Sequence, residues 1–333
     1  MEKRRGNPLV TFSVLVLGLL LLLLAAEGIA RLRWSENQLL LVPSMPFLQD
    51  DPILLWRLRP DLNLQVWPGE PLRTNHLGMR DEEVGPKRAD VPRILSLGES
   101  TTWGHGVRAA ETYTELLPGL MKRPVEALNA GTPAWSIWQS SLYLQREGMA
   151  LQPDMVLVYH LANDFLPRGA SNPRDPFRVT LTDRQLSDAR RPLAPILSLL
   201  SASRLRQGLW SLWLAPAMAG KGSGGRDVVR VPEADRREAI QQMVRLCEEK
   251  GVILVLIKPI YAKARYAEDR LLDSYANRSH NVYVANLPVW KSEQGLGDEG
   301  LFQPDDTHPT PAGHRWIAER LAAYLNIPPA EAH

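Results

Sequence analysis

The chain has 333 residues, with 39 Lys and Arg against 37 Asp and Glu, and 44% of its residues are hydrophobic. This length allows one large domain or two ordinary ones, each with a real core. The net charge of +2 excludes an evident nucleic-acid partner, because proteins that bind nucleic acids carry a large basic excess. The single cysteine, Cys247, excludes an internal disulfide and any metal site built from cysteines.

Much of the apolar content lies in the first thirty residues. A basic cluster at residues 3–5 precedes an uncharged run over residues 7–26, which ends in six leucines and two alanines. A helix of this length reaches about 30 Å, the thickness of a bilayer core. A cleavable signal peptide is the alternative, but it needs a shorter apolar region and a small-residue cleavage site. The residues after Ala26 offer no clear site of that kind, so we expect an uncleaved signal-anchor over residues 1–33.

The flanking charges bear on the orientation of this helix. The basic cluster favours a cytoplasmic N-terminus, since positive charge is enriched on the cytoplasmic side of membrane helices. Arg31 and Arg33 on the other flank weaken this bias. We expect a single-pass protein of the cell membrane, in which lipid contacts the N-terminal helix and the rest of the chain is extracytoplasmic.

The rest of the chain divides into a connector and a domain. Residues 34–90 are rich in proline and lack a sustained period, although residues 62–66 alternate like an edge strand. We interpret them as a connector with some edge β-structure. In the domain over residues 91–327, short apolar runs alternate with helical patterns. The predicted strands are Arg93–Leu97, Val125–Ala130, Met155–His160, Val252–Ile257 and Val282–Ala285.

Strands of this nearly uniform apolar kind suit a parallel sheet that is covered on both faces. A helix predicted over Asp235–Lys250 has one apolar stripe that includes Cys247, which is therefore expected to be a core residue rather than a reactive thiol. A last helix is predicted over about Ala312–Leu325. The alternation predicts a three-layer α/β/α domain whose ligands bind beyond the C-terminal ends of the strands.

About seventy residues interrupt this pattern before Asp235. They include the pair Trp210 and Trp213 and a glycine-rich break at residues 221–225. The stretch is too long for a plain loop in a compact domain, so we expect a helical insertion over about residues 166–232. A lid, a membrane-facing element and an insertion packed on its own domain are all compatible with the sequence.

A serine follows the first predicted strand directly. Ser100 lies between Gly98 and Gly104, two residues that permit sharp bends, and the end of a strand is a place that a substrate can reach. Serine needs a base, because its hydroxyl is a poor nucleophile at neutral pH. A base is suggested near the other end of the chain, where His308 follows Asp305 by three residues.

This spacing lets a carboxylate orient the imidazole while the imidazole Nε2 takes the serine proton. Two alternatives stay open. Asp306 instead of Asp305 can be the partner of His308, although the spacing favours Asp305. Either aspartate can be a metal ligand, but no histidine cluster in the sequence supports a metal site.

Four short blocks in chain order resemble the SGNH/GDSL hydrolase superfamily. The blocks are Gly98-Glu99-Ser100, Asn129-Ala130-Gly131, Ala162-Asn163-Asp164 and Asp305-x-x-His308. Each lies at the C-terminal end of a predicted strand or in a late loop, and the resemblance covers roughly residues 74–325, including the lead-in at 73–80. It implies a flavodoxin-like sheet and serine-dependent ester hydrolysis without a metal or other cofactor.

The resemblance also implies the role of each site residue. Ser100 is the nucleophile, His308 the base and Asp305 its orienting carboxylate. The oxyanion hole comprises the Ser100 N–H, the Gly131 N–H and the Asn163 side-chain amide. Donors of this kind are worth about 3–4 kcal/mol each. Gly131 lacks a Cβ and is expected to leave room for the substrate.

Two residues depart from the family's pattern. Glu99 stands where the family has Asp, and we expect it to shape the turn before Ser100. Leu161 stands where glycine is usual, a change that narrows the expected pocket near Asn163. Neither change removes a predicted catalytic group.

Neighbouring aromatic residues are candidates for substrate binding. Trp103 and His160 lie next to the first and third blocks, and aromatic faces suit a sugar ring or an acyl chain. Ring burial between helix and sheet is the alternative for Trp103. Packing or surface roles are the alternative for His160 and for His105, which also lies near the predicted site.

These residues favour a serine esterase or acylhydrolase of the SGNH type, presented outside the cytoplasm. Its expected substrates are acyl or acetyl esters, among them esters on cell-envelope carbohydrate. An O-acetyltransferase that passes the acyl group to an exopolysaccharide would use the same triad. A non-catalytic envelope scaffold that keeps the hydrolase fold is the remaining alternative.

Overall fold

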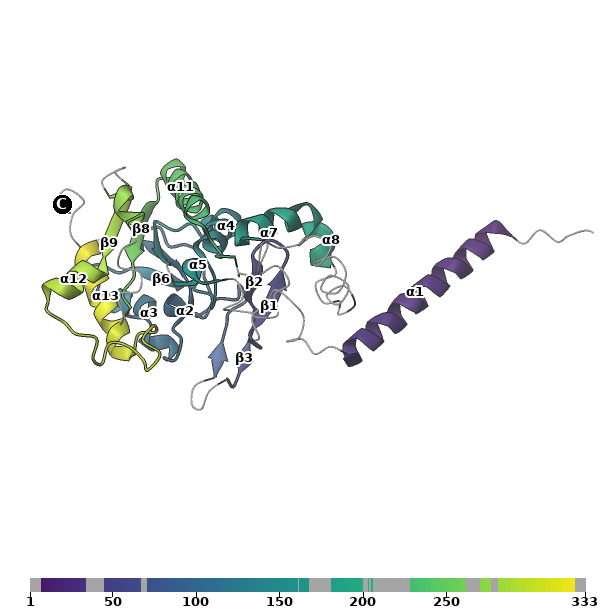
Figure 1. Ribbon diagram of the computed structural model, residues 1–333, viewed down its shortest axis with the longest axis horizontal. Coiled ribbons are helices and arrows are strands. Elements are labelled where there is room, and N and C mark those ends of the chain that lie inside the picture. Colours follow the sequence, from purple (N-terminus) through teal and green to yellow (C-terminus); the bar gives the residue numbers. More distant parts are fainter. Residues whose placement is uncertain are drawn as a thin grey trace, which may run out of the picture.

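A five-stranded parallel sheet forms the centre of the protein (Figure 1). The computed structural model describes residues 7–33, 45–66, 71–160, 162–167, 181–199, 203, 205, 228–261, 270–276 and 281–326. The strands of the sheet are β5 (Arg93–Gly98), β6 (Glu126–Asn129), β7 (Met155–Tyr159), β8 (Ile253–Lys258) and β9 (Val282–Asn286). Each predicted strand is present to within one residue at either end.

The order of the strands in space is β6-β5-β7-β8-β9. Numbered along the chain this is 2-1-3-4-5, the order of flavodoxin-like sheets. The flavodoxin-like fold class predicted from the sequence is therefore confirmed. In such sheets ligands bind beyond the C-terminal ends of the strands, close to the point where the strand order reverses. Here that point lies between β5 and β7.

Helices cover both faces of the sheet, because successive strand residues point to opposite sides. Leu95 and Val156 belong to one apolar core, and their neighbours Ile94 and Leu157 belong to the other. The three predicted layers are thus present. The helices are α4 (Ile137–Arg146) and α11 (Glu233–Lys250) on the first face, and α3 (Tyr113–Leu120), α12 (Leu287–Glu293) and α13 (Pro311–Leu325) on the second.

Cys247 lies on the buried stripe of α11. Its side chain is fully buried, and burial raises the pKa of the Cys247 thiol to about 12. A thiol with such a pKa carries almost no thiolate at neutral pH, and the thiolate is the reactive form. The predicted core role of Cys247 is confirmed.

The N-terminal helix α1 (Pro8–Arg33) projects away from the α/β domain (Figure 1). It contains a window with a mean hydropathy of 2.8, none of which is buried. Its 26 residues correspond to about 39 Å of helix. By length and composition α1 is able to cross a membrane, and a signal sequence near an N-terminus has the same properties.

The segment between α1 and the sheet forms two small antiparallel pairs. They are β1 (Leu48–Asp51) with β2 (Leu55–Leu58), and β3 (Asn63–Leu64) with β4 (Leu72–Arg73). Neither pair joins the central sheet. Trp56 nevertheless packs in the same core as α4, and its indole donates to the Pro133 carbonyl at 3.2 Å. This part of the chain therefore covers residues that precede α4.

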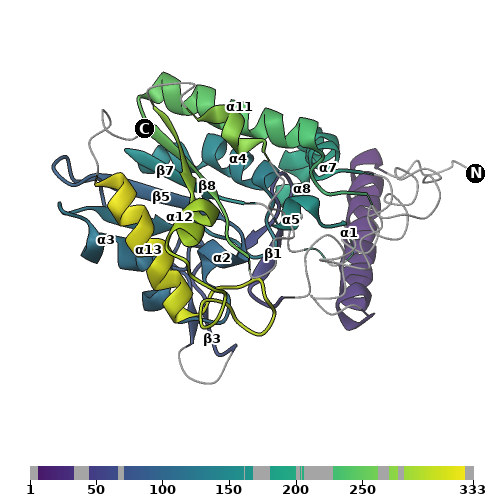
Figure 2. The ribbon, with the colours of Figure 1, turned by 60° about the vertical axis from the view of Figure 1, so that its left-hand side comes forward.

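The predicted insertion is helical in its described part. It contains α7 (Asp183–Arg190), a 3-10 turn (Arg191–Leu193) and α8 (Ala194–Leu199). Both views place α7 and α8 on the side of the domain that faces α1 (Figure 1 and Figure 2). The pair Trp210 and Trp213 and the glycine-rich break at 221–225 lie outside the described residues.

Candidate active site

Ser100 is the first residue of the short helix α2 (Ser100–Trp103), which follows β5 at the C-terminal edge of the sheet. A Cβ on Gly98 would lie 1.9 Å from Thr102 Oγ1 and 2.9 Å from the Tyr159 carbonyl oxygen, so only glycine fits there. Gly104 ends α2 in the left-handed conformation, with a φ of 87°. The first N–H groups of a helix have no partner within it, and the N–H of Ser100 is one of these.

The loop before α13 carries Asp305 and His308. Two backbone hydrogen bonds close this loop, from the N–H of Thr310 to the Leu301 carbonyl at 3.0 Å and from the N–H of Gln303 to the His308 carbonyl at 2.8 Å. The Thr310 hydroxyl then caps α13 by accepting the N–H of Gly313. Helix capping thus fixes the chain just after His308.

Ser100, His308 and Asp305 form a continuous hydrogen-bonded series. His308 Nε2 lies 2.8 Å from Ser100 Oγ, and His308 Nδ1 lies 2.6 Å from Asp305 Oδ2. Asp305, and not its neighbour Asp306, is therefore the carboxylate that contacts the imidazole. A base in contact with a serine hydroxyl and oriented by a carboxylate is the arrangement that activates serine for nucleophilic attack.

Asp305 is held in its ionised form. Its partial burial acts to raise the pKa, but hydrogen bonds from the His308 backbone, the His308 ring and the Thr307 backbone outweigh that effect. The two backbone N–H groups both donate to Asp305 Oδ1 at 2.9 Å. These two bonds and the bond to the His308 ring lower the pKa of Asp305 to about 2, so a carboxylate faces the imidazole at neutral pH.

The ring of His105 packs against that of His308 in a tilted arrangement, with 4.3 Å between the ring centroids and 35° between the ring planes. Burial and the charge of His308 lower the pKa of His105. One possible ligand atom from each of His105, Asp305 and His308 lies within 4.8 Å of the others. The sequence predicted no histidine cluster here, and that prediction is wrong, because the fold brings His105 next to His308 and Asp305. A metal held by these atoms would compete with the hydrogen bonds of Asp305 and His308.

Gly131, in the loop after β6, is packed against α2. A Cβ on Gly131 would lie 2.3 Å from the Trp103 nitrogen and 2.7 Å from the Thr102 carbonyl carbon. The predicted reason for this glycine, room for a substrate, is thus replaced by another, the close approach of α2. The Gly131 N–H donates to Asn129 Oδ1 at 3.1 Å, so this predicted oxyanion donor has an internal acceptor here.

Asn163 is the second residue of α5 (Ala162–Phe165), which begins shortly after β7. Its Nδ2 donates to the Trp135 carbonyl at 3.1 Å, which uses one of the two hydrogens of the amide. Its backbone N–H donates to Glu99 Oε2 at 3.1 Å. Glu99 thus does more than shape its own turn, because it links the first block to the third. Leu161 lies outside the described residues.

The two candidate substrate-binding residues lie inside the protein. Trp103 is fully buried, with its ring stacked on Phe47 at 5.1 Å and the Arg80 guanidinium 5.0 Å from the ring centroid. His160 is 3% exposed, and its Nε2 lies 2.7 Å from Ser140 Oγ. Burial lowers the pKa of His160 to about 3. Both rings pack rather than line a substrate surface, because the segment before β5 and the helix α4 cover them.

Tyr261 belongs to this site and was missed in the sequence. It lies three residues beyond the end of β8, and its hydroxyl donates to Glu99 Oε1 at 3.2 Å. The same hydroxyl accepts the Ala162 N–H at 3.1 Å. The position of Tyr261 just beyond a strand end was the signal that could have found it, since ligands bind at this edge of the sheet.

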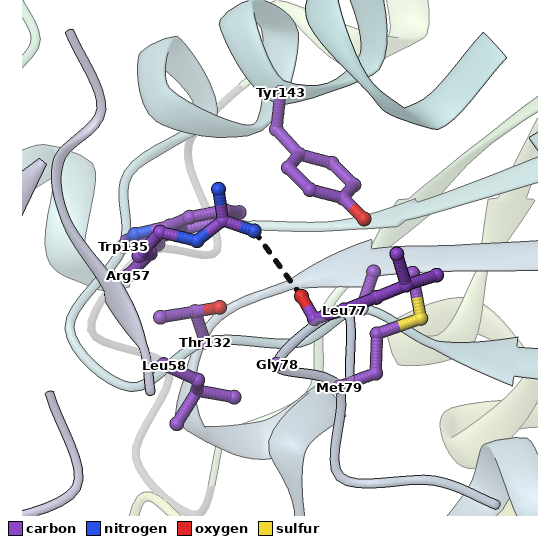
Figure 3. A pocket seen from close by; sticks show the side chains of 9 residues that line it. Arg57, Leu58, Leu77, Gly78, Met79, Thr132, Trp135 and Tyr143 are labelled. Atoms are coloured by element: carbon purple, nitrogen blue, oxygen red, sulfur yellow. Dashed lines mark hydrogen bonds between the residues drawn. The ribbon is translucent and has the colours of Figure 1, made fainter. Parts of the chain in front are cut away.

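A small cavity lies behind the second block (Figure 3). Its lining includes Ala130 and Thr132 on either side of Gly131, and Arg57, whose guanidinium donates to the Leu77 carbonyl at 3.1 Å. The cavity measures about 10 Å³, which is room for about one water molecule. It is too small for any part of an ester substrate, and neither Ser100 nor His308 lines it.

Solved structures similar to this chain include three described as lipolytic or esterase proteins. A putative lipolytic protein of the G-D-S-L family from Desulfitobacterium hafniense is 14% identical, with 69% of this chain and 98% of that one covered and a TM-score of 0.43. A lipase/acylhydrolase from Enterococcus faecalis is 16% identical, with 71% of this chain and 96% of that one covered and a TM-score of 0.42. An acetylxylan esterase from Geobacillus stearothermophilus is 14% identical, with 74% of this chain and 100% of that one covered and a TM-score of 0.44.

No family model matches the chain, and no curated protein matches its sequence. The fold assignment therefore rests on the strand order of the central sheet and on the helices that cover its two faces.

Proposed function

We propose that this protein is a serine esterase or acylhydrolase of the SGNH type. The observation that carries the proposal is the series Ser100 Oγ, His308 Nε2, His308 Nδ1 and Asp305 Oδ2, with separations of 2.8 Å and 2.6 Å. Serine, an imidazole in contact with it and an ionised carboxylate behind the imidazole are the parts that acyl transfer requires. The strand-end position of Ser100 supports the same function.

The reaction proceeds in two halves. Ser100 Oγ attacks the ester carbonyl carbon while His308 Nε2 takes the hydroxyl proton, and the resulting oxyanion accepts hydrogen bonds from the Ser100 N–H and the Asn163 amide. The tetrahedral intermediate collapses, the C–O bond to the alcohol breaks, and His308 returns the proton to the leaving oxygen. Water then attacks the acyl-serine with His308 as base, which releases the acid and restores Ser100.

Gly131 enters this mechanism only if its N–H leaves Asn129. In the free protein that N–H is bonded to Asn129 Oδ1. Hydrogen bonds at catalytic sites often tighten or rearrange only when substrate is bound, so the third donor is assigned to the complex with substrate.

We further propose that α1 anchors the protein as a single-pass membrane helix with the α/β domain outside the cytoplasm. Its length and hydropathy support this assignment. Glu27, near the end of α1, accepts hydrogen bonds from Ser203 Oγ at 2.8 Å and from the Leu205 N–H at 3.0 Å. The insertion thus contacts the anchor, and acetyl or acyl esters of cell-envelope carbohydrate would be within reach. Protease treatment of spheroplasts tests the topology, since a protected domain beside a protected cytosolic marker would contradict it.

The test of the activity is turnover of p-nitrophenyl acetate by the full chain in detergent. We expect hydrolysis by the wild type and a loss of at least about a thousandfold in Ser100→Ala. A fluorophosphonate probe, which reacts with activated serines, is expected to label the wild type and not the variant. Absence of both turnover and labelling in the wild type would favour a non-catalytic scaffold.

Hydrolysis and acyl transfer are separated by a second measurement. The same preparation receives p-nitrophenyl acetate together with a polysaccharide that carries free hydroxyl groups. If acetylated polysaccharide accumulates faster than acetate, the acceptor is a hydroxyl group and the protein is an O-acetyltransferase. If acetate is the main product, the assignment as an esterase holds.

A further inference from the structure

A buried carboxyl group lies next to the serine that we propose as nucleophile. Glu99 directly precedes Ser100 and is 2% exposed. Both of its oxygens have hydrogen-bond partners on other elements: Oε2 accepts the Asn163 N–H at 3.1 Å, and Oε1 accepts the Tyr261 hydroxyl at 3.2 Å. A side chain from the first block therefore holds the backbone of the third block.

Tyr261 completes this contact. Its hydroxyl oxygen accepts the Ala162 N–H at 3.1 Å. Glu99 and Tyr261 together thus bind the N–H groups of the first two residues of α5. The first N–H groups of a helix need acceptors from outside the helix, and here those acceptors come from the residue that follows β5 and from the segment after β8. The position of α5, and with it of Asn163, depends on these two side chains.

We propose that Glu99 and Tyr261 are positioning residues that hold Asn163 at the distance from Ser100 at which its amide stabilises the oxyanion. This proposal rests on the function proposed above and adds two residues to it. The Asn163 side chain is held at one further point, its bond to the Trp135 carbonyl. With the backbone and one amide hydrogen both fixed, the second amide hydrogen has a defined direction.

The charge of Glu99 follows from its surroundings. Burial raises the pKa of Glu99 to about 8, and the nearby carboxyl of Asp164 acts in the same direction. Hydrogen bonds from Asn163 and Tyr261 and the charge of Arg230 oppose this shift. Tyr159 on β7 also faces Glu99, and its pKa is raised by burial far above the ordinary value. Glu99 is therefore mainly neutral at pH 7.

A neutral Glu99 suits this position, because a carboxylate there would repel the negative charge that develops on the substrate oxygen. Above about pH 8 Glu99 ionises, and we expect kcat to fall. Glu99→Gln keeps a carbonyl oxygen for the Asn163 N–H and an amide for Tyr261, so it imitates the neutral form. Glu99→Asp is one methylene shorter and cannot reach both partners.

The experiment compares the full-length wild type with Glu99→Gln, Glu99→Asp and Tyr261→Phe, using p-nitrophenyl acetate between pH 6 and pH 9.5. For Glu99→Gln we expect a kcat within about threefold of the wild type at pH 7 and no fall at high pH. For Glu99→Asp we expect kcat to fall about tenfold or more while KM changes little. The Tyr261 hydroxyl favours the ionised form of Glu99. In Tyr261→Phe this hydroxyl is absent, so we expect the fall in kcat to move to higher pH and kcat itself to be lower.

Two results would overturn the proposal. One is a fall above pH 8 that persists in Glu99→Gln, and the other is a Glu99→Gln variant that melts like the wild type but loses as much activity as Asn163→Ala. Selective ¹⁵N-asparagine labelling gives a readout that does not depend on turnover. The Asn163 backbone amide should shift with a midpoint near pH 8 in the wild type and not in Glu99→Gln. If wild-type Ser100 neither turns over substrate nor reacts with the fluorophosphonate, the proposed function fails, and the labelled amide still tests the contact with Glu99.

Discussion

Asp305 and Glu99 are two carboxyl groups in the hydrogen-bond network around Ser100, and their surroundings differ in every respect that sets a pKa. The Asp305 side chain is 44% exposed and accepts two backbone N–H groups and an imidazole, and its pKa is about 2. Glu99 is buried beside another carboxyl, and its pKa is about 8. One is ionised and the other neutral at pH 7, as in enzymes that use two carboxyl groups for different tasks.

The site thus has an open side, where Asp305 is exposed, and a buried side, where Glu99 is enclosed, and the two sides differ in what they contribute. In the mechanism that we propose, the open side, with Asp305 and His308, supplies charge and moves the proton. In the same mechanism the buried side, with Glu99, Tyr261 and Asn163, supplies a fixed position for a neutral donor. The first is sensitive to the removal of a functional group, and the second is sensitive to small changes in geometry.

The largest effect is expected on the open side, for His308→Ala. Without the base Ser100 cannot lose its proton, and kcat should fall about 10⁴- to 10⁶-fold. The matched control is His105→Ala, which removes the neighbouring imidazole at 4.3 Å. It should change kcat by less than about tenfold, since His105 takes no proton in the proposed mechanism. Steady-state turnover of p-nitrophenyl acetate measures both. Equal losses in the two variants would mean that the base is misassigned.

Asp305→Asn is expected to lower kcat by about 10⁴-fold, because an amide favours the wrong tautomer of His308. The same variant tests the charge of Asp305. A depressed pKa stabilises the fold above the unfolded value of about 4, and this contribution is lost as pH falls towards 2. The difference in Tm between wild type and Asp305→Asn should therefore be constant above about pH 5 and shrink below it. A difference that grows on acidification would contradict the assignment.

On the buried side, Asn163→Ala removes the amide donor. The expected loss in kcat is about 10²- to 10³-fold, with KM changed much less. The control is Asn163→Asp, which keeps the size of the side chain but replaces the donor with an acceptor, and it should be at least as inactive. A variant lacking the amide that kept more than a third of wild-type kcat would remove Asn163 from the mechanism.

The smallest effect is expected from Gly131→Ala, and it concerns packing. The added Cβ would meet the Trp103 nitrogen at 2.3 Å, an overlap that costs about 1–3 kcal/mol as α2 moves away. Gly119→Ala is the matched control, because Gly119 lies in α3 and an added Cβ has no neighbour within 4 Å. That control should gain about 0.5–1 kcal/mol. Chemical denaturation measures both, and a stable Gly131→Ala protein would show that α2 adapts without cost.

The positions of the catalytic candidates were predictable because each follows a strand or precedes a helix with a strong pattern. Ser100 follows β5, Asn163 lies in the first turn of the helix after β7, and His308 precedes α13. The partner of His308 was also predictable, since a separation of three residues suffices for contact between Asp305 and the ring. The burial of Trp103 and His160 was not predictable, because closeness in sequence to a site says nothing about which side of the backbone a ring occupies.

The strand and helix pattern, the apolar N-terminal helix and the local pairing of Asp305 with His308 can all be predicted from the sequence alone. These depend on periodicity and on separations of a few residues, which are properties of the chain before it folds. Three contacts are properties of the folded chain alone: His105 packs against His308, Gly131 touches α2, and Glu99 and Tyr261 accept the N–H groups of Asn163 and Ala162. Those contacts join residues that are far apart in the sequence, and the charge of Glu99 depends on the burial and the neighbours that such contacts create.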